Sequence, residues 1–276
     1  MKISDKDIKN FERQLLNEEK SAATIEKYLR DIRFFGKYLG DREITKENVM
    51  LYKERLKSDY APASANSMLV ALNCFLRFLG LSECSVRLLR IQRQIFCRED
   101  KELSRQEYRS LLRAANGRRI SCIIQTICGT GIRVSELEYI TVESVKAGKA
   151  SVDCKNKTRV ILIPASIKEM LKKYIRKNGI VSGPVFLGRN GRPLDRSSIW
   201  RQMKALCKTA GVAAGKVFPH NLRHLFARTF YSIEKDIVRL ADLLGHSSIN
   251  TTRIYVMETG RRHLTCLEKM QHILLT

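Results

Sequence analysis

The chain has 276 residues, of which 51 are lysine or arginine and 28 are aspartate or glutamate, so its formal net charge is +23. Hydrophobic residues make up 44% of the chain, which excludes an intrinsically disordered protein and is enough for two domain cores. A positive charge of this size indicates a polyanionic partner, with nucleic acid as the first candidate. The sequence contains neither a signal peptide nor an apolar run long enough to span a bilayer, so we expect a cytoplasmic protein that makes no membrane contact.

The positive charge is concentrated in the later part of the chain. Residues 1–100 carry 19 basic and 15 acidic side chains, whereas residues 101–276 carry 32 and 13. We therefore expect the later part to make the main electrostatic contact with nucleic acid. None of the eight cysteines forms a Cys-x-x-Cys pair, so the sequence predicts no zinc site and no other cofactor.

The first 96 residues are predicted to form a small helical domain of about four helices. Gly40 and Gly80 stand where two of the helices are expected to end. Apolar residues at helical spacing, together with breakers, place three of the helices at about 21–39, 46–56 and 64–79.

A polar stretch, 97–103, is predicted to link this domain to a second one over 104–276. The second domain is predicted to be mostly α with a small antiparallel sheet. Its first helix is expected after Ser104, because Glu107 completes a capping box there. Farther along, residues 129–131 (GTG) are expected to turn into a helix with Arg133 just inside its start.

A β-hairpin is predicted next. Strands at 150–154 and 159–163 flank a turn at 155–158, and Pro164 ends the second strand. Ser166 and Glu169 then predict a second capping box. The rest reads as helical, with a helix at about 197–210 and breaks at 215–219, 245 and 260.

Four later segments combine arginine, histidine and tyrosine in a fixed order. Residues 130–137 read TGIRVSEL, 220–224 read HNLRH, 243–247 read LLGHS, and 250–256 read NTTRIYV. Arginine binds phosphate by bidentate hydrogen bonds, histidine moves protons near neutral pH, and tyrosine can act as a covalent nucleophile. Together these residue types suit chemistry on a phosphodiester.

Two arginines and a histidine are the candidates for binding the phosphate. Arg133 and Arg223 could stabilise the extra negative charge of a pentacoordinate transition state. His220, Arg223 and His224 are spaced i, i+3 and i+4, so they share one helix face, and Pro219 suits the start of that helix. His224 is expected to be a structural partner. Taken singly, each arginine could equally lie in a surface ion pair.

Tyr255 is the candidate nucleophile. A phenol is protonated at neutral pH, so it needs a nearby base or surrounding positive charge before it can attack. His246, nine residues earlier, follows a glycine, where a histidine is most often a cap or a surface residue. Tyr255 is one of nine tyrosines, and taken alone it could merely pack.

The order and wording of these segments resemble the tyrosine recombinases of the phage-integrase family, with the Xer-like recombinases as the nearest type. The resemblance extends to the first domain, where SAAT at 21–24 precedes Tyr28 and Phe35. It implies an N-terminal core-binding, SAM-like domain followed by a catalytic domain. It also implies catalytic roles for one set of residues: Arg133, Lys155, His220, Arg223, His246 and Tyr255.

By this resemblance, Tyr255 attacks DNA to give a 3′-phosphotyrosyl link, and a lysine on the hairpin turn protonates the leaving 5′-hydroxyl. Aligning Lys157, Thr158 and Arg159 with the final Lys-x-Arg of the family wording leaves Lys155 as the acid. Lys157 stays the alternative, because the turn is one residue shorter than in the usual wording. Glu136 is expected to support the site. The implied partners are double-stranded recombination sites, bound by a homotetramer alone or with a sister recombinase, with strand exchange through a Holliday junction. A C-terminal helix within 260–276 would pack on a neighbouring protomer.

Two other functions stay open at this point. A type IB topoisomerase shares the chemistry and relaxes DNA without exchanging partners. A DNA-binding regulator built on an inactive recombinase would lack a catalytic residue, and none is missing from the sequence.

Overall fold

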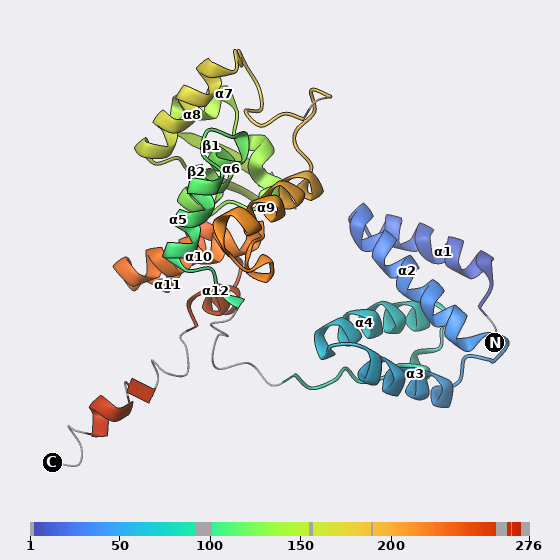
Figure 1. The fold of residues 1–276 in the computed structure, drawn as a ribbon. Helices are drawn as coiled ribbons and strands as arrows, with labels where there is room; N and C mark the ends of the chain where they lie inside the picture. Colours follow the sequence, from blue (N-terminus) through green and yellow to red (C-terminus); the bar gives the residue numbers. More distant parts are fainter. Residues whose placement is uncertain are drawn as a thin grey trace. The chain divides into compact units, whose positions relative to one another are not determined.

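The computed structural model of the chain describes residues 3–91, 101–154, 157–188, 190–257, 264–265 and 267–271. The chain divides into two compact units, Met1–Arg93 and Gln94–Thr276 (Figure 1). Both units are mostly helical. In the described residues, the second unit contains one antiparallel sheet of two strands. The predicted fold class, mostly α with a small antiparallel sheet, is confirmed.

The first unit is a helical bundle, as predicted. Its helices are α1 (Asp5–Asn17), α2 (Ala22–Leu39), α3 (Lys46–Asp59) and α4 (Pro62–Phe78). Ser21 caps α2 by accepting a hydrogen bond from the N–H of Thr24, and Gly40 ends the helix. The apolar faces meet in one core of fully buried side chains, which include Phe11, Leu15, Ile32, Phe35, Leu56, Leu72 and Phe75.

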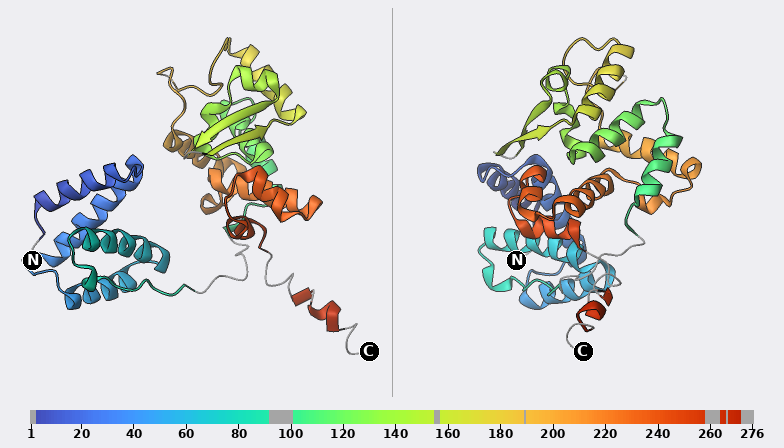
Figure 2. Two further views of the ribbon diagram at one scale, coloured as in Figure 1. Left: turned by 180° about the vertical axis from the view of Figure 1, so that it is seen from behind. Right: turned by 90° about the vertical axis from the view of Figure 1, so that its left-hand side faces the viewer.

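The second unit is built from short helices around the sheet (Figures 1 and 2). The elements before and within the sheet are α5 (Arg105–Ala114), α6 (Arg119–Thr130), the 3₁₀ helix η3 (Val134–Tyr139), α7 (Val142–Ala147), β1 (Lys149–Cys154) and β2 (Lys157–Leu162). The later elements are α8 (Ala165–Lys177), α9 (Arg196–Ala210), the 3₁₀ helix η4 (Ala214–Lys216), α10 (Pro219–Glu234), α11 (Ile237–Leu244) and α12 (Ile249–Val256).

Two capping boxes were expected in this unit, and one of them forms. Ser104 accepts a hydrogen bond from the N–H of Glu107, and the Glu107 carboxylate accepts one from the N–H of Ser104. The box at Ser166 and Glu169 is wrong. Helix α8 begins directly after Pro164, so Ser166 lies inside its first turn and no side chain caps the helix.

The hairpin has a shorter loop than predicted. Strands β1 and β2 pair Asp153 with Thr158 and Cys154 with Lys157, so the ladder continues through two positions that were assigned to the turn. A four-residue turn at 155–158 is therefore wrong, since only residues 155–156 lie between the paired strands.

Helix α10 organises the part of the fold that carries the candidate site. It packs on α6 and on α12, and Pro219 occupies its first turn, as predicted. Gly131 ends α6 in the left-handed conformation, with φ of +66°, and a Cβ there would meet the Phe226 ring at 2.5 Å. The two helices can therefore approach this closely only where glycine stands.

A second cluster of apolar side chains, separate from the main core of this unit, lies under the last helices. Ala227, Leu240, Leu244 and Tyr255 are buried there, so the candidate nucleophile belongs to a packed core. Within the described ranges, no helix is both long and apolar enough to cross a bilayer.

Candidate active site

Five of the six residues predicted to act on a phosphodiester lie close together in the second unit. They are Arg133, His220, Arg223, His246 and Tyr255. They come from helix ends and helix faces: the residue before η3, the start of α10, the residue after the glycine that ends α11, and the last turn of α12. The spacing that placed His220, Arg223 and His224 on one face of α10 is confirmed by their contacts.

Arg223 is the most buried of the set, with 1% of its surface exposed. Its Nη1 donates a hydrogen bond to the carbonyl of Gly131 at 2.6 Å, and its Nη2 donates to the carbonyl of Leu244 at 2.7 Å. Nε is also buried and has no hydrogen-bond partner among the described residues. Burial, reinforced by Arg133, lowers the pKa of Arg223 to about 10, which leaves the guanidinium charged at neutral pH. The Arg223 guanidinium thus bonds to the ends of both α6 and α11, and its Nε–H remains without an acceptor among the described residues.

A buried carboxylate holds two arginines beside it. Glu136, with 1% of its surface exposed, accepts from the N–H of Arg133 at 2.7 Å and from Nη1 of Arg133 at 2.8 Å. Its Oε2, which accepts the Arg133 N–H, also pairs with Nη2 of Arg159, whose Nη1 donates to the carbonyl of Leu243 at 2.6 Å. Burial alone would raise the pKa of Glu136, but the hydrogen bonds from Arg133 and the charge of Arg159 outweigh it and lower the pKa. Glu136 therefore stays ionised and fixes both guanidinium groups.

Arg133 differs from its predicted place by one residue. It is the cap before η3, with an extended backbone, so it is not inside a helix start. The reason is that Gly131 ends α6 in the left-handed conformation and Arg133 is extended, so the next turn begins only at Val134. The Arg133 side chain is 39% exposed, which leaves it open to a ligand.

His246 is held at both ring nitrogens. Nε2 lies 2.9 Å from Nη2 of Arg223, and Nδ1 lies 2.8 Å from Oγ1 of Thr252. Because a guanidinium only donates, Nε2 must accept, so the proton of the neutral ring sits on Nδ1 and is donated to Thr252. Burial and the charges of Arg223 and Arg133 lower the pKa of His246 to about 4. The ring is therefore neutral near pH 7.

Tyr255 and His220 form the pair that could start the reaction. The phenol oxygen lies 3.3 Å from Nε2 of His220, and the tyrosine is 7% exposed. Burial, followed by the charges of Arg223 and Arg133, lowers the pKa of His220 below its usual 6.5. A neutral His220 can accept the phenol proton, which is what a general base next to a nucleophile must do.

His224 packs against Tyr255 in the structure. The two rings are stacked, with centroids 4.2 Å apart and planes at 28°. Nδ1 of His224 faces the Glu102 carboxylate at 3.7 Å, and Glu102 also pairs with Arg228 at 3.0 Å. Burial lowers the pKa of His224 to about 3, with further contributions from His220 and Arg228.

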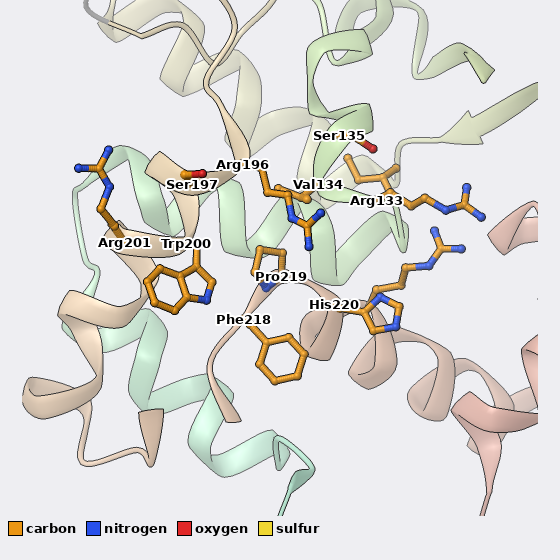
Figure 3. Close-up of a pocket in the computed structure, with 12 residues that line it drawn as sticks. Arg133, Val134, Ser135, Arg196, Ser197, Trp200, Arg201, Phe218, Pro219 and His220 are labelled. Carbon is orange, nitrogen blue, oxygen red and sulfur yellow. The ribbon is translucent and has the colours of Figure 1, made fainter. Parts of the chain in front are cut away.

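A pocket of about 860 Å³ opens beside these residues (Figure 3). Arg133, His220 and Arg223 line one side of it. Figure 3 shows the rings of Trp200 and Phe218 on the other side, with the guanidinium of Arg196 between the two groups. The remaining lining residues are Ile132, Val134, Ser135, Ser197, Arg201 and Pro219. Basic groups beside aromatic surfaces suit a nucleotide chain, which offers phosphates and ring faces.

The predicted general acid, Lys155, lies outside the described residues. The alternative, Lys157, begins β2 and pairs with Cys154, so its backbone belongs to the ladder.

Sequence reasoning missed three residues that complete the site. They are Arg159, which pairs with Glu136, Thr252, which bonds to His246, and Glu102, which faces His224. From the sequence, Arg159 was expected only as part of the hairpin and Glu102 only as part of the linker. Thr252 had no expected role. Thr252 precedes Tyr255 by three residues, so helical spacing alone would have placed both on one face of α12. Arg159 and Glu102 act across long sequence separations, which no local pattern reveals. Among the described residues, no group of three His, Cys, Asp or Glu could hold a metal ion.

Comparison with known families matches both units. Residues 101–261 match the phage integrase family, and residues 8–82 match the N-terminal SAM-like domain of phage integrases. The first match alone spans more than half of the chain.

Curated relatives match over nearly the whole length. The tyrosine recombinase XerA of Thermococcus kodakarensis is 30% identical over 278 residues, covering 96% of this chain and 95% of that protein. XerA of Pyrococcus furiosus is 29% identical over 275 residues, covering 95% and 93%.

Solved structures show the same architecture. A lambda integrase (75–356) dimer bound to a COC′ core site superposes with a TM-score of 0.75 at 20% identity, over 93% of this chain and 96% of that one. The crystal structure of XerA recombinase superposes with a TM-score of 0.53 at 25% identity, and the alignment covers 97% of this chain and 97% of that one. The similarity to lambda integrase supports the fold alone, and the family matches support the family assignment. The chain therefore belongs to the phage integrase family of tyrosine recombinases, a class of enzymes that cleaves and rejoins DNA strands.

Proposed function

We propose that this chain is a site-specific DNA recombinase in which Tyr255 is the nucleophile and His220 its general base. The observation that carries the proposal is the 3.3 Å approach of the phenol oxygen to Nε2 of His220, beside two arginines that reach no acidic partner except Glu136 among the described residues. Both named relatives are tyrosine recombinases, and a solved structure with the same fold is that of the XerH site-specific recombinase.

The reaction balances without an external energy source. The Tyr255 oxygen bonds to a DNA phosphorus as its proton passes to His220, and the bond from phosphorus to the 5′ oxygen breaks. Lys155, or Lys157 in its place, gives a proton to that oxygen. Attack of a 5′-hydroxyl on the phosphotyrosine then releases Tyr255 and reseals a strand. Each step exchanges one phosphodiester for another, so no nucleotide hydrolysis is required.

The arginines and His246 would hold the phosphate. Arg133, half open to solvent, and Arg223, with its spare Nε, supply fixed positive charge where the transition state gains negative charge. His246 would give a hydrogen bond to the same phosphate, as the family motif implies. Its Nε2 now accepts from Arg223, so to donate to a phosphate the ring must give up that contact and either move its proton from Nδ1 to Nε2 or gain a second proton.

The assembly is proposed to be a homotetramer on two duplexes, alone or with a sister recombinase, passing through a Holliday junction. A solved lambda integrase forms a tetramer on such a junction. In the C-terminal segment, Leu264, Leu267 and Met270 are 57%, 56% and 48% exposed, which supports docking on a neighbour. Residues 260–263, 266 and 272–276 of the predicted exchange helix lie outside the described ranges. Since its substrate is DNA, the chain is expected in the cytoplasm. Removing residues 261–276 should abolish tetramers on DNA while leaving DNA binding by the monomer, and an unchanged assembly would refute trans docking.

Covalent capture tests the chemistry. Nicked duplexes with a randomised central stretch are incubated with the protein in EDTA, and adducts that survive detergent are isolated and sequenced. Wild-type protein should give adducts enriched for one sequence, and Tyr255→Phe should give none. Equal adducts from both proteins would remove Tyr255 from the reaction, and adducts without sequence preference would favour a topoisomerase. The topoisomerase and the inactive regulator are not favoured by the relatives, which are named as recombinases.

A further inference from the structure

The ring of His224 is the closest of the rings around the proposed nucleophile. Its centroid lies 4.2 Å from that of Tyr255 with the planes 28° apart, whereas His246 lies at 5.2 Å and 42°, and His220 at 5.4 Å and 66°. Only His224, of the described rings, therefore lies face to face with the phenol.

His224 has no chemical task in the reaction as proposed. It does not line the pocket, and its Nδ1 is buried without a hydrogen-bond partner among the described residues. The Glu102 carboxylate, 3.7 Å away, is the acidic group facing that nitrogen, and Arg228 pairs with the same carboxylate. The ring contacts that remain for His224 are its flat face against Tyr255 and an edge contact with His220, with centroids 4.8 Å apart and planes at 71°.

Glu102 belongs to a short segment that is fastened along α10. The carbonyl of Lys101 accepts a hydrogen bond from Nδ2 of Asn221 at 2.9 Å. The carbonyl of Leu103 accepts one from Nη2 of Arg228 at 2.7 Å, and the Leu103 side chain is fully buried. The backbone on both sides of Glu102 is thus held to the helix that carries His220 and Arg223. This fixes where the carboxylate stands relative to His224.

We infer that His224 is a positioning residue of the cleavage reaction: its ring sets the plane of the Tyr255 phenol, and Glu102 sets the plane of that ring. The inference rests on the proposed function of Tyr255. Attack on a phosphorus requires the phenol oxygen to approach in line with the leaving oxygen, so rotation of the ring out of place slows the reaction without changing DNA binding. The arrangement connects the nucleophile to residues 101–103, the end of the predicted interdomain linker.

Two substitutions of His224 with side chains of similar bulk distinguish the effect of a planar ring from the effect of filling the space. His224→Phe keeps a planar ring and removes Nδ1, whereas His224→Leu fills the space without a flat face. The measurements are the dissociation constant for the duplex selected by wild-type covalent capture, and the single-turnover rate of adduct formation at saturating DNA. We expect His224→Leu to slow adduct formation by about 10- to 100-fold at unchanged affinity, and His224→Phe to stay within about threefold of wild type.

The outcomes are all decisive. Equal slowing by Phe and Leu, or no slowing by either, would overturn the role of the flat face. Melting temperatures accompany each rate, and where His224→Leu unfolds, His224→Met replaces it as the non-planar variant. If wild-type protein forms no adduct at all, the proposed function fails; if every His224 variant forms adducts at the wild-type rate, only this inference fails.

A double-mutant cycle tests the part played by Glu102. Glu102→Gln keeps the shape of the side chain and removes its charge. It should slow adduct formation in the wild-type background and have a smaller effect in the His224→Phe background, where no Nδ1 remains to be oriented. The same slowing in both backgrounds would show that Glu102 acts through Arg228 alone and would overturn the coupling to His224.

Discussion

The phenol oxygen of Tyr255 lies 3.3 Å from Nε2 of His220, a residue 35 positions earlier in the chain and on a different helix. If His220 accepts the phenol proton, His220→Gln should slow adduct formation by about 10²- to 10⁴-fold while affinity for the selected duplex stays the same. Single-turnover adduct formation and an equilibrium binding titration measure the two quantities. A wild-type rate in His220→Gln would show that another group takes the proton.

The same pair predicts how cleavage depends on pH. Burial and the neighbouring arginines lower the pKa of His220 below 6.5, so the base is free at neutral pH and is lost only in acid. The second-order rate of adduct formation, which reports the free enzyme, should therefore be level at neutral pH and fall at a pH below 6.5. A fall that begins well above pH 6.5 would contradict a base that is neutral at pH 7.

Glu136 is expected to matter for stability as well as for geometry, because both its partners are arginines and it is almost fully buried. Glu136→Gln should lower the free energy of unfolding by about 2–3 kcal/mol, since it leaves two guanidinium groups without their counter-charge. Denaturant titration at pH 7 measures the loss. Glu169→Gln is the matched control: its ion pair with Lys172 is exposed, so its loss should lower the free energy of unfolding far less. Equal losses of unfolding free energy in the two variants would show that the buried ion pairs of Glu136 stabilise the fold no more than an exposed pair does.

Two glycines with the same backbone conformation should respond differently to alanine. Gly245 (φ +62°) and Gly211 (φ +65°) each end a helix, but a Cβ on Gly245 would overlap Cδ of Arg159, whereas nothing lies within 4 Å of one on Gly211. Both variants carry the left-handed strain of about 1–2 kcal/mol. Gly245→Ala should in addition displace Arg159 and slow adduct formation, and Gly211→Ala should leave the rate unchanged. Similar rates in the two variants would show that the position of Arg159 does not affect cleavage.

His224 predicts an acid sensitivity of the fold. Its pKa is about 3 in the folded chain against the usual 6.5, so the unfolded chain binds a proton that the folded chain does not between these values. Stability is therefore full above about pH 6.5 and falls as pH drops, by about 1.4 kcal/mol per pH unit from this residue. Unfolding titrations between pH 7 and pH 4.5 should show a shallower fall for His224→Phe than for wild type. Parallel curves would mean that His224 titrates normally.

Features that depend on residues close together in the sequence could be predicted from it, and features that depend on distant residues could not. The capping box at Ser104 and the helix start at Pro219 were predictable because each depends on residues within one turn. The face shared by His220 and Arg223 was predictable because helical spacing fixes it. The hairpin register was missed, since Cys154 and Lys157 pair through a two-residue loop that the composition of 155–158 does not specify.

The contacts that assemble the site are of longer range. Arg159 reaches Glu136 across 23 positions, and Arg223 reaches Gly131 across 92. Either arginine could have lain in solvent as far as local sequence is concerned. The motifs therefore predicted which side chains belong to the candidate site, and the packing of α6, α10 and α11 shows which backbone carbonyls and carboxylates hold them.

The burial of Arg223 constrains how this protein can lose its activity. The guanidinium that would stabilise the transition state is also the group that satisfies the carbonyls of Gly131 and Leu244 in the interior. Replacing Arg223 leaves those carbonyls unpaired, so inactivation at this position also damages the fold. Tyr255→Phe removes only a hydroxyl and keeps the packed ring. A descendant that kept DNA binding but gave up cleavage would therefore be expected to change at the nucleophile while retaining its buried arginine.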